Sequence, residues 1–298
     1  MQPENPAPAG HRAGFVSIIG KPNVGKSTLM NALVGERLSI ITSKAQTTRH
    51  RIFGIINGAD FQIVYSDTPG IIAPKYELHR SMMRFVNTSL DDADVVLFVT
   101  DIYEQLDEEH VLRKLERVEA PVLVLVNKID QAKQDDIQTK IAAWAERLPG
   151  RDVVALSALH GFNLDRVLDF ILEHLPEHPP YFPKDQLTDK SERFFASEII
   201  REKILQNYKK EVPYSTEVVI SEFREAEDII RMRAEILVER DSQKGILIGK
   251  KGEALKRVGT QARHDMEAFF GKAVFLEQFV KVSPDWRRDR RRLDQFGY

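Results

Sequence analysis

Hydrophobic and polar positions follow two different patterns along this chain, and the change of pattern divides it. In the first 175 residues, short runs of Val, Ile and Leu recur between stretches with apolar residues at helical spacing. Runs that are apolar throughout are typical of strands buried on both faces of a sheet. Strands are predicted at residues 14–19, 51–56, 61–66, 95–100, 122–127 and 153–156, with helices at 26–34, 77–89, 108–117, 134–146 and 164–174. This alternation predicts an α/β domain with a mixed, mostly parallel, doubly wound sheet.

The second half has an α+β pattern. Four prolines in residues 176–183 cannot continue a helix or a central strand, so a domain boundary is expected there. Beyond it, the spacing predicts helices at 192–208, 245–248 and 253–270, and strands at 216–223, 229–239 and 274–282. The predicted division is a disordered lead-in at 1–11, a first domain at 12–175, a linker at 176–191, a second domain at 192–284 and a basic tail at 285–298.

Composition narrows the classes of protein that this chain can be. A length of 298 residues suggests about two domains, and the lack of cysteine excludes disulfides and thiolate-bound zinc. The net charge of −2 hides an uneven distribution, because residues 244–298 carry 13 basic and 7 acidic side chains. This concentration of positive charge favours a polyanionic partner for the C-terminal region, with a solvated charged face as the alternative.

Residues 20–27 form a glycine-bounded loop between a predicted strand and a predicted helix. Such a loop followed by Lys-Ser is a phosphate-binding P-loop, in which backbone N–H groups and the helix N-terminus face the phosphates. Lys26 is expected to reach the β- and γ-phosphates, and the Ser27 hydroxyl to bind Mg²⁺. The predicted nucleotide contacts of this loop are Gly20, Asn23, Val24, Gly25, Lys26, Ser27 and Thr28.

Three further motifs follow predicted strands in the order that a nucleotide site requires. Asp67 is placed to hold Mg²⁺, and the Gly70 N–H to sense the γ-phosphate. Asp130 is placed to accept hydrogen bonds from the N1–H and 2-amino groups of guanine, which adenine cannot donate. The remaining predicted contacts are Asn127, which ties its loop to the P-loop, Lys128 along the base, and Ser157 with Ala158, whose N–H is expected to reach guanine O6.

These motifs resemble the ordered set of small GTP-binding proteins, and residues 44–51 resemble the first switch of Era GTPases. The resemblance runs from about residue 14 to residue 292 and implies GTP or GDP and Mg²⁺ as cofactors. It predicts metal ligands Ser27, Thr48 and Asp67, with Thr47 as a close rival of Thr48, and catalytic roles for Lys26, Thr48 and Gly70. A Thr ligand bound only in the GTP state supplies the differential affinity of a switch.

Ile71 departs from the pattern of Ras-type enzymes, which orient the attacking water with a Gln after the Asp-x-x-Gly motif. Isoleucine offers no hydrogen-bonding group, so slow intrinsic turnover is expected, as the resemblance to Era also implies. Related GTPases use a P-loop Asn to coordinate potassium, which makes Asn23 a candidate; a simple loop-forming role is the alternative.

Residues 249–252 read Gly-Lys-Lys-Gly within the α-β-β-α-α-β order and resemble the loop of a type II KH domain. In that fold the loop lets a nucleic-acid backbone approach closely, and four nucleotides lie over an adjoining groove. Most of the surface of Ile246 and Ile248 is expected to lie in the core, and the exposed part of each side chain is expected to support bases. The predicted RNA contacts are Ile246, Ile248, Gly249, Lys250, Lys251, Gly252, Lys256, Arg257, Trp286 and Arg287.

The resemblance implies a GTP hydrolase whose nucleotide state controls its binding to the 3′ end of small-subunit ribosomal RNA during assembly of that subunit. It also implies a cytoplasmic monomer, with peripheral association at the inner face of the cell membrane left open. Two alternatives are kept: an RNA-binding KH protein whose nucleotide domain is regulatory or structural, and a P-loop kinase of small metabolites. A metabolite kinase would not need the motif of residues 127–130. The presence of Lys26 and Asp67 disfavours a nucleotide domain that is only structural.

Overall fold

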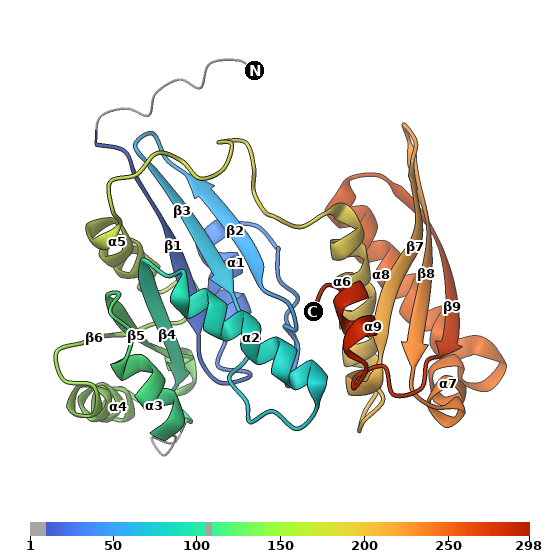
Figure 1. The fold of residues 1–298 in the computed structure, drawn as a ribbon, viewed down its shortest axis with the longest axis horizontal. Helices are drawn as coiled ribbons and strands as arrows, with labels where there is room; N and C mark the ends of the chain where they lie inside the picture. The colour runs from blue at the N-terminus through green and yellow to red at the C-terminus, as the bar shows by residue number, and fades with distance from the viewer. Residues whose placement is uncertain (1–9, 105–108) are drawn as a thin grey trace. The chain divides into compact units, whose positions relative to one another are not determined.

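A computed structural model of the chain describes residues 10–104 and 109–298, which form two compact units (Figure 1). The first unit holds the described residues up to Ser39, together with Thr48–Ala73 and Met82–Asp189. The second holds Ile40–Thr47, Pro74–Ser81 and Lys190–Tyr298. The prediction assigned all of residues 12–175 to the first domain, whereas two segments within that range belong to the second unit.

The first unit contains a six-stranded sheet in the order β2-β3-β1-β4-β5-β6. All neighbours in it are parallel except β2, which pairs antiparallel with β3. The mixed, mostly parallel sheet that the sequence predicted is confirmed. The strands are β1 Arg12–Ile19, β2 Ile52–Asn57, β3 Phe61–Asp67, β4 Val95–Asp101, β5 Val122–Asn127 and β6 Asp152–Ala155.

Helices lie on both faces of this sheet, with α2 in front of it and α1 behind it in Figure 1. They are α1 Lys26–Val34, α2 Glu77–Asp91, α3 Glu109–Glu116, α4 Gln134–Arg147 and α5 Leu164–His174. Because β1, β3, β4, β5 and β6 run parallel, their carboxyl ends meet at one edge. Ligand sites of open α/β sheets lie at that edge.

The Pro-rich segment predicted as a linker packs against the first unit along most of its length. The carbonyl of Pro176 accepts from the Ala13 N–H, and the carbonyl of Leu187 accepts from the Ile55 N–H. At the other end of the chain, residues 1–9 of the predicted disordered lead-in lie outside the described residues. Its last residue, His11, is buried with Nδ1 2.8 Å from the His178 carbonyl oxygen, so the ordered chain begins before residue 12.

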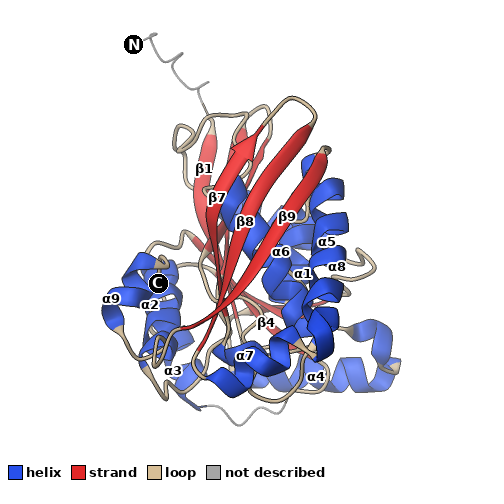
Figure 2. Ribbon diagram, turned by 90° about the vertical axis from the view of Figure 1, so that its right-hand side faces the viewer, coloured by secondary structure: helices blue, strands red, loops and turns tan. Residues whose placement is uncertain are grey.

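The second unit has the predicted α-β-β-α-α-β order. Strand β7 pairs antiparallel with β8, which pairs parallel with β9, and helices α6 and α8 lie behind the three strands in Figure 2. Its elements are α6 Glu192–Asn207, β7 Glu217–Glu225, β8 Ile229–Val238, α7 Asp241–Ile248, α8 Glu253–Phe270, β9 Ala273–Val282 and α9 Arg290–Gln295. Helix α9 lies in the segment predicted as a basic tail, which the sequence pattern did not identify as helical.

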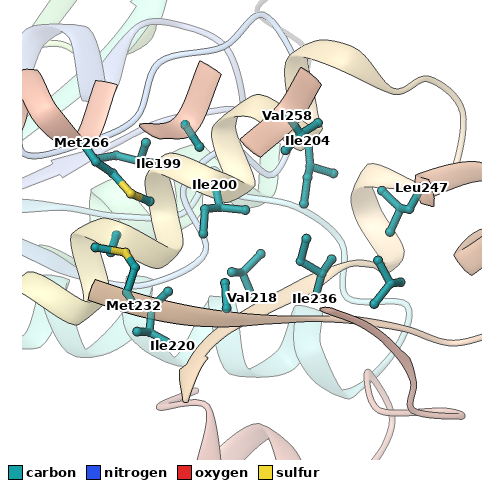
Figure 3. Packing of buried hydrophobic residues seen from close by; sticks show 14 of the residues in the cluster. Ile199, Ile200, Ile204, Val218, Ile220, Met232, Ile236, Leu247, Val258 and Met266 are labelled. Atoms are coloured by element: carbon teal, nitrogen blue, oxygen red, sulfur yellow. The ribbon is translucent and has the colours of Figure 1, made fainter. Parts of the chain in front are cut away.

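The core of the second unit lies between the helices and the sheet (Figure 3). Ile200 and Ile204 of α6 are completely buried among side chains of the strands, including Met232 and Ile236 of β8. Burying one such side chain contributes about 1.5–3 kcal/mol to folding. This packing fixes α6 on the sheet, and it therefore also fixes the positions of the polar side chains on the other faces of α6.

Within the described parts of the chain, we find no helix with the length and apolar character needed to cross a membrane.

Candidate nucleotide site and nucleic-acid interface

The loop of residues 20–27 joins the end of β1 to α1. Gly25 precedes α1 with a φ of 100° and provides no side-chain cap, so the first N–H groups of the helix face the loop. A Cβ atom at Gly25 would lie 2.3 Å from Nδ2 of Asn127. Glycine is therefore required here both by its backbone conformation and by the close approach of Asn127.

Lys26 is only 6% exposed and points into this loop. Its ammonium donates to the backbone carbonyls of Lys21, at 2.7 Å, and Gly20, at 3.2 Å. Burial lowers the pKa of Lys26 to about 8, while the negative charges of Asp67 and Glu104 act in the opposite direction. A buried ammonium beside a curled backbone is suited to an anionic group, and phosphate oxygens in the loop would favour its charged form.

The residues predicted to hold Mg²⁺ come together in the first unit. Ser27 Oγ donates to Asp67 Oδ2 at 2.7 Å and lies 2.9 Å from Thr48 Oγ1, which is 3.4 Å from the same carboxylate oxygen. Burial raises the pKa of Asp67, opposed first by Lys26 and then by the hydroxyl hydrogen bonds. Among the described residues, the buried Asp67 Oδ1 finds no hydrogen-bond partner. One carboxylate and two hydroxyls fit the oxygen ligands that Mg²⁺ prefers, and the unpartnered oxygen is a further acceptor at the same place.

The structure separates Thr48 from its rival Thr47. Thr47 Oγ1 donates to the Lys44 carbonyl at 2.6 Å and lies 2.7 Å from Thr42 Oγ1, within the second unit. Thr48 is instead beside Ser27 and Asp67 in the first unit. The geometry therefore favours Thr48 as the metal ligand.

Gly70 and Ile71 lie directly against the P-loop. A Cβ at Gly70 would come 2.6 Å from the Pro22 nitrogen, so this position accommodates only glycine without movement of the backbone. The Ile71 N–H donates to the Gly20 carbonyl at 3.0 Å, and the Ile71 side chain is buried. A buried alkyl chain cannot orient a water, which agrees with the slow intrinsic turnover expected from the sequence.

Asn127 ties the predicted base-binding loops to the P-loop. Its Nδ2 donates to the Val24 carbonyl at 2.9 Å, as the sequence predicted, and its Oδ1 accepts from the Ala158 N–H at 3.0 Å. The Ala158 N–H thus holds the two loops together in this structure, and its contact with guanine O6 stays a prediction.

Asp130 is held in place by Ser157, which was also predicted to belong to the nucleotide site. Ser157 Oγ donates to Asp130 Oδ1 at 2.6 Å, and this hydrogen bond is the main cause of the lowered pKa of Asp130. The carboxyl group is therefore ionised at neutral pH and can accept hydrogen bonds from the guanine edge. Lys128 Nζ donates to the Asn23 carbonyl at 2.6 Å and to Asp101 Oδ2 at 2.7 Å, which holds its stem between the two loops.

Sequence reasoning missed three polar residues of this site. Ser39 Oγ donates to Asp67 Oδ2 at 2.8 Å, Asp101 pairs with Lys128, and Glu104 forms an ion pair with Lys21 at 3.2 Å. For Asp101 a signal existed, since it ends β4 opposite Asn127 in the parallel register. Ser39 and Glu104 lie in irregular segments, where the hydrophobic pattern gives no direction to a side chain.

The Gly-Lys-Lys-Gly loop of the second unit connects α7 to α8. Gly249 has a φ of 72°, and a Cβ there would meet the Cβ of Ala254 at 2.6 Å. Lys250 and Lys251 are both exposed, as are Lys256 and Arg257 in the first turns of α8. The predicted cations therefore share one exposed region beside a backbone that only glycine can form.

Both isoleucines before this loop were predicted to lie mainly in the core, and the structure differs for one of them. Ile246 is 51% exposed, Ile248 packs partly on the core, and Leu247 between them is completely buried. Leu247 thus anchors α7, while Ile246 offers apolar surface next to the exposed lysines.

Trp286 requires a correction. It was expected to stack on a base, but it is completely buried, its indole N–H donates to the Ser215 carbonyl at 3.0 Å, and its ring packs against Phe296. Arg287 is likewise engaged, with its guanidinium paired to Glu239 and lying over the Tyr76 ring. Both residues hold the C-terminal segment in the second unit, since burial removes the indole ring from water and Glu239 pairs with the guanidinium.

Comparison with known proteins agrees with this arrangement. A family model described as a 50S ribosome-binding GTPase matches residues 15–128, and a KH-domain model matches residues 211–287. The chain is 46% identical to the GTPase Era of Geotalea daltonii, covering 96% of this chain and 97% of that protein. It is 43% identical to the GTPase Era of Staphylococcus haemolyticus, with 97% of each chain covered.

Solved structures show the same likeness. Era in complex with MgGDPNP and nucleotides 1506–1542 of 16S ribosomal RNA is 41% identical, with a TM-score of 0.92 over 97% of this chain and 99% of that one. An Aquifex aeolicus Era variant bound to GDP and AlF₄⁻ has the same identity and TM-score, over 96% of this chain and 99% of that one. Fold and site together define a P-loop GTPase domain joined to a KH domain. The chain belongs to the Era family of GTPases.

Proposed function

We propose that this chain is a GTP-hydrolysing switch that binds the 3′ end of small-subunit ribosomal RNA and assists assembly of that subunit. The observation that carries the proposal is the presence of two built sites in one chain. Ser27, Thr48 and Asp67 converge on one point, and the exposed Lys250 and Lys251 flank a backbone suited to close approach by phosphates. The solved Era complex with MgGDPNP and the 3′-terminal nucleotides of 16S ribosomal RNA supports the same pairing of ligands.

Hydrolysis requires positioning and charge stabilisation more than covalent chemistry. Lys26 supplies a buried positive charge for the transferring phosphoryl group, and Gly70, which lies against Pro22 of the P-loop, would offer its N–H to a γ-phosphate oxygen. Mg²⁺, when bound, neutralises charge on the β- and γ-oxygens, and Ser27, Thr48 and Asp67 would hold it. Thr48 responds to the nucleotide, because its hydroxyl is a ligand only while a γ-phosphate keeps its segment in place.

The convergence of Ser27, Thr48 and Asp67 disfavours a nucleotide domain that is only structural, since such a domain needs no buried, unpartnered carboxylate oxygen. The family resemblance further predicts a cytoplasmic monomer, and it leaves open a potassium ion at Asn23 and peripheral association with the inner face of the cell membrane. Asn23 has a left-handed backbone with a φ of 67°, which a loop-forming role explains equally well. These finer points stay predictions.

The RNA site is tested by reversing the charge of its loop. Lys250→Glu combined with Lys251→Glu should weaken binding of an RNA oligonucleotide from the 3′ end of small-subunit ribosomal RNA. Each lost phosphate contact should reduce the slope of log affinity against log salt by about 1, so the slope should fall by about 2. Fluorescence anisotropy across a salt series measures both quantities.

The matched control is Arg224→Glu combined with Lys272→Glu, which changes the net charge by the same amount. Arg224 is exposed near the end of β7, and Lys272 follows α8 at the end opposite the loop. An 18-residue helix is about 27 Å long, so these side chains are remote from residues 249–252. Equal losses in the two double variants, or no loss in the first, would place the RNA site elsewhere.

A further inference from the structure

If the chain has the proposed function, its nucleotide site and its RNA loop influence each other. The segment Ile40–Thr47 belongs to the second unit although it precedes the proposed metal ligand Thr48 directly in the chain. A force on Thr47 therefore reaches Thr48 through a single peptide bond.

Helix α6 holds this segment by its polar groups. Glu202 Oε1 accepts from the Ile41 N–H at 3.2 Å, and the Arg201 guanidinium donates to the carbonyls of Gln46, at 3.3 Å, and Thr47. Arg201 and Glu202 are each only 1% exposed, and Glu198 fixes the Arg201 guanidinium with a hydrogen bond of 2.7 Å. Buried and oriented charges of this kind have one favoured arrangement, so they restrict the backbone that they hold.

A second attachment lies at the C-terminal end of the same helix. The Lys44 ammonium donates to the carbonyls of Leu205, in the last turn of α6, and Tyr208, which follows the helix. A cation at this position is favoured because the last carbonyls of a helix lack partners within it.

Tyr208 extends this attachment to the RNA loop. Its hydroxyl donates to the Leu247 carbonyl at 2.6 Å in a buried hydrogen bond. Leu247 is completely buried in the last turn of α7, two residues before Gly249. Burial raises the pKa of Tyr208, so the phenol remains a donor at neutral pH.

We propose that Tyr208 couples RNA binding to the nucleotide state, through its hydroxyl on the Leu247 carbonyl and its own carbonyl on Lys44. Movement of residues 249–252 on binding RNA shifts the last turn of α7, and the hydrogen bond transmits that shift to the end of α6. Lys44 then carries it to the segment that leads into Thr48. Linkage makes the effect reciprocal, so the nucleotide changes RNA affinity by the same factor as RNA changes nucleotide affinity.

The test measures the ratio of RNA affinities of the full chain with a non-hydrolysable GTP analogue and Mg²⁺ and with GDP and Mg²⁺. Coupling factors of about 5- to 150-fold are typical for linked sites. Tyr208→Phe removes only the hydroxyl, so the ratio should fall at least about threefold toward 1, while GTP hydrolysis without RNA stays within about twofold. A purely structural role would change both affinities together and leave the ratio as it was.

Tyr298→Phe is the matched control, because the Tyr298 hydroxyl also makes a buried hydrogen bond in this unit, to Glu217 Oε2 at 2.7 Å. It should leave the ratio unchanged. A wild-type ratio of 1, or a full ratio in Tyr208→Phe, would overturn the coupling role of Tyr208. If the wild-type chain bound no RNA in either state, the proposed function itself would fail, and this inference with it.

A double-variant cycle tests the route. Lys44→Met keeps the aliphatic stem and removes the contact with the carbonyl of Tyr208. If both groups lie on one route, the double variant with Tyr208→Phe should have the same ratio as the lower of the two single variants. Fully additive losses would contradict a shared route.

Discussion

Lys26→Met should lower the single-turnover rate of GTP hydrolysis by at least about 100-fold, the usual cost of removing one group that stabilises the transition state. Methionine retains the length of the buried stem but has no charge to place against the transferring phosphoryl group. Lys26 is 6% exposed and donates to the carbonyls of two adjacent loop residues, Gly20 and Lys21, so another cation cannot easily take its place. Because Ile71 predicts a slow wild-type reaction, the measurement uses excess protein over labelled GTP.

Lys21→Met is the matched control, since it makes the same chemical change in the same loop. Lys21 pairs with Glu104 at 3.2 Å, and we expect its loss to change the rate by no more than a few fold. An unchanged rate in Lys26→Met would contradict a catalytic nucleotide site. It would favour the alternative of an RNA-binding protein with a structural nucleotide domain.

Asp130→Asn should change the preferred base from guanine to xanthine, with a loss of GTP affinity on the order of 10²- to 10⁵-fold. In the proposed base site, the Asp130 carboxylate would accept from the N1–H and 2-amino groups of guanine, and Ser157 Oγ donates to it at 2.6 Å. An amide presents a donor where the 2-amino group would be and leaves it unpaired, whereas xanthine has a carbonyl there. Competition between GDP and XDP for a fluorescent nucleotide measures the change.

Asp135→Asn controls for loss of one negative charge, because Asp135 is an exposed acid in the first turn of α4. Its nucleotide preference should match that of the wild-type protein. Persisting GTP selectivity in Asp130→Asn would remove Asp130 from the base site. A wild-type preference for ATP would instead favour the small-molecule kinase that shares only the P-loop.

The parts of the nucleotide site at strand ends were predictable from the sequence. Asp67 ends β3 and Asn127 ends β5, and parallel neighbours bring such positions to one edge of the sheet. The glycines of the P-loop were predictable for a related reason, since a loop that approaches phosphates tolerates few side chains. Periodicity also indicated α8 with its observed bounds, because an 18-residue helix repeats its apolar positions several times.

The remaining features depend on contacts between distant residues. Trp286 stands in an arginine-rich run whose local composition indicates solvent exposure, and only the fold supplies the Ser215 carbonyl and the Phe296 ring that bury it. The Arg201 contacts with Gln46 and Thr47 span about half the chain and leave no periodic signal. The choice between Thr47 and Thr48 likewise required the positions of Ser27 and Asp67.

The most direct measurement of the central claim is ultraviolet crosslinking of the protein in cells, followed by sequencing of the attached RNA. The account predicts that crosslinks gather at the 3′ end of small-subunit ribosomal RNA. They should be depleted in the Lys250→Glu, Lys251→Glu variant and retained in the Arg224→Glu, Lys272→Glu control. Crosslinks spread evenly over cellular RNA, or unchanged by reversing the charge of residues 250 and 251, would contradict it.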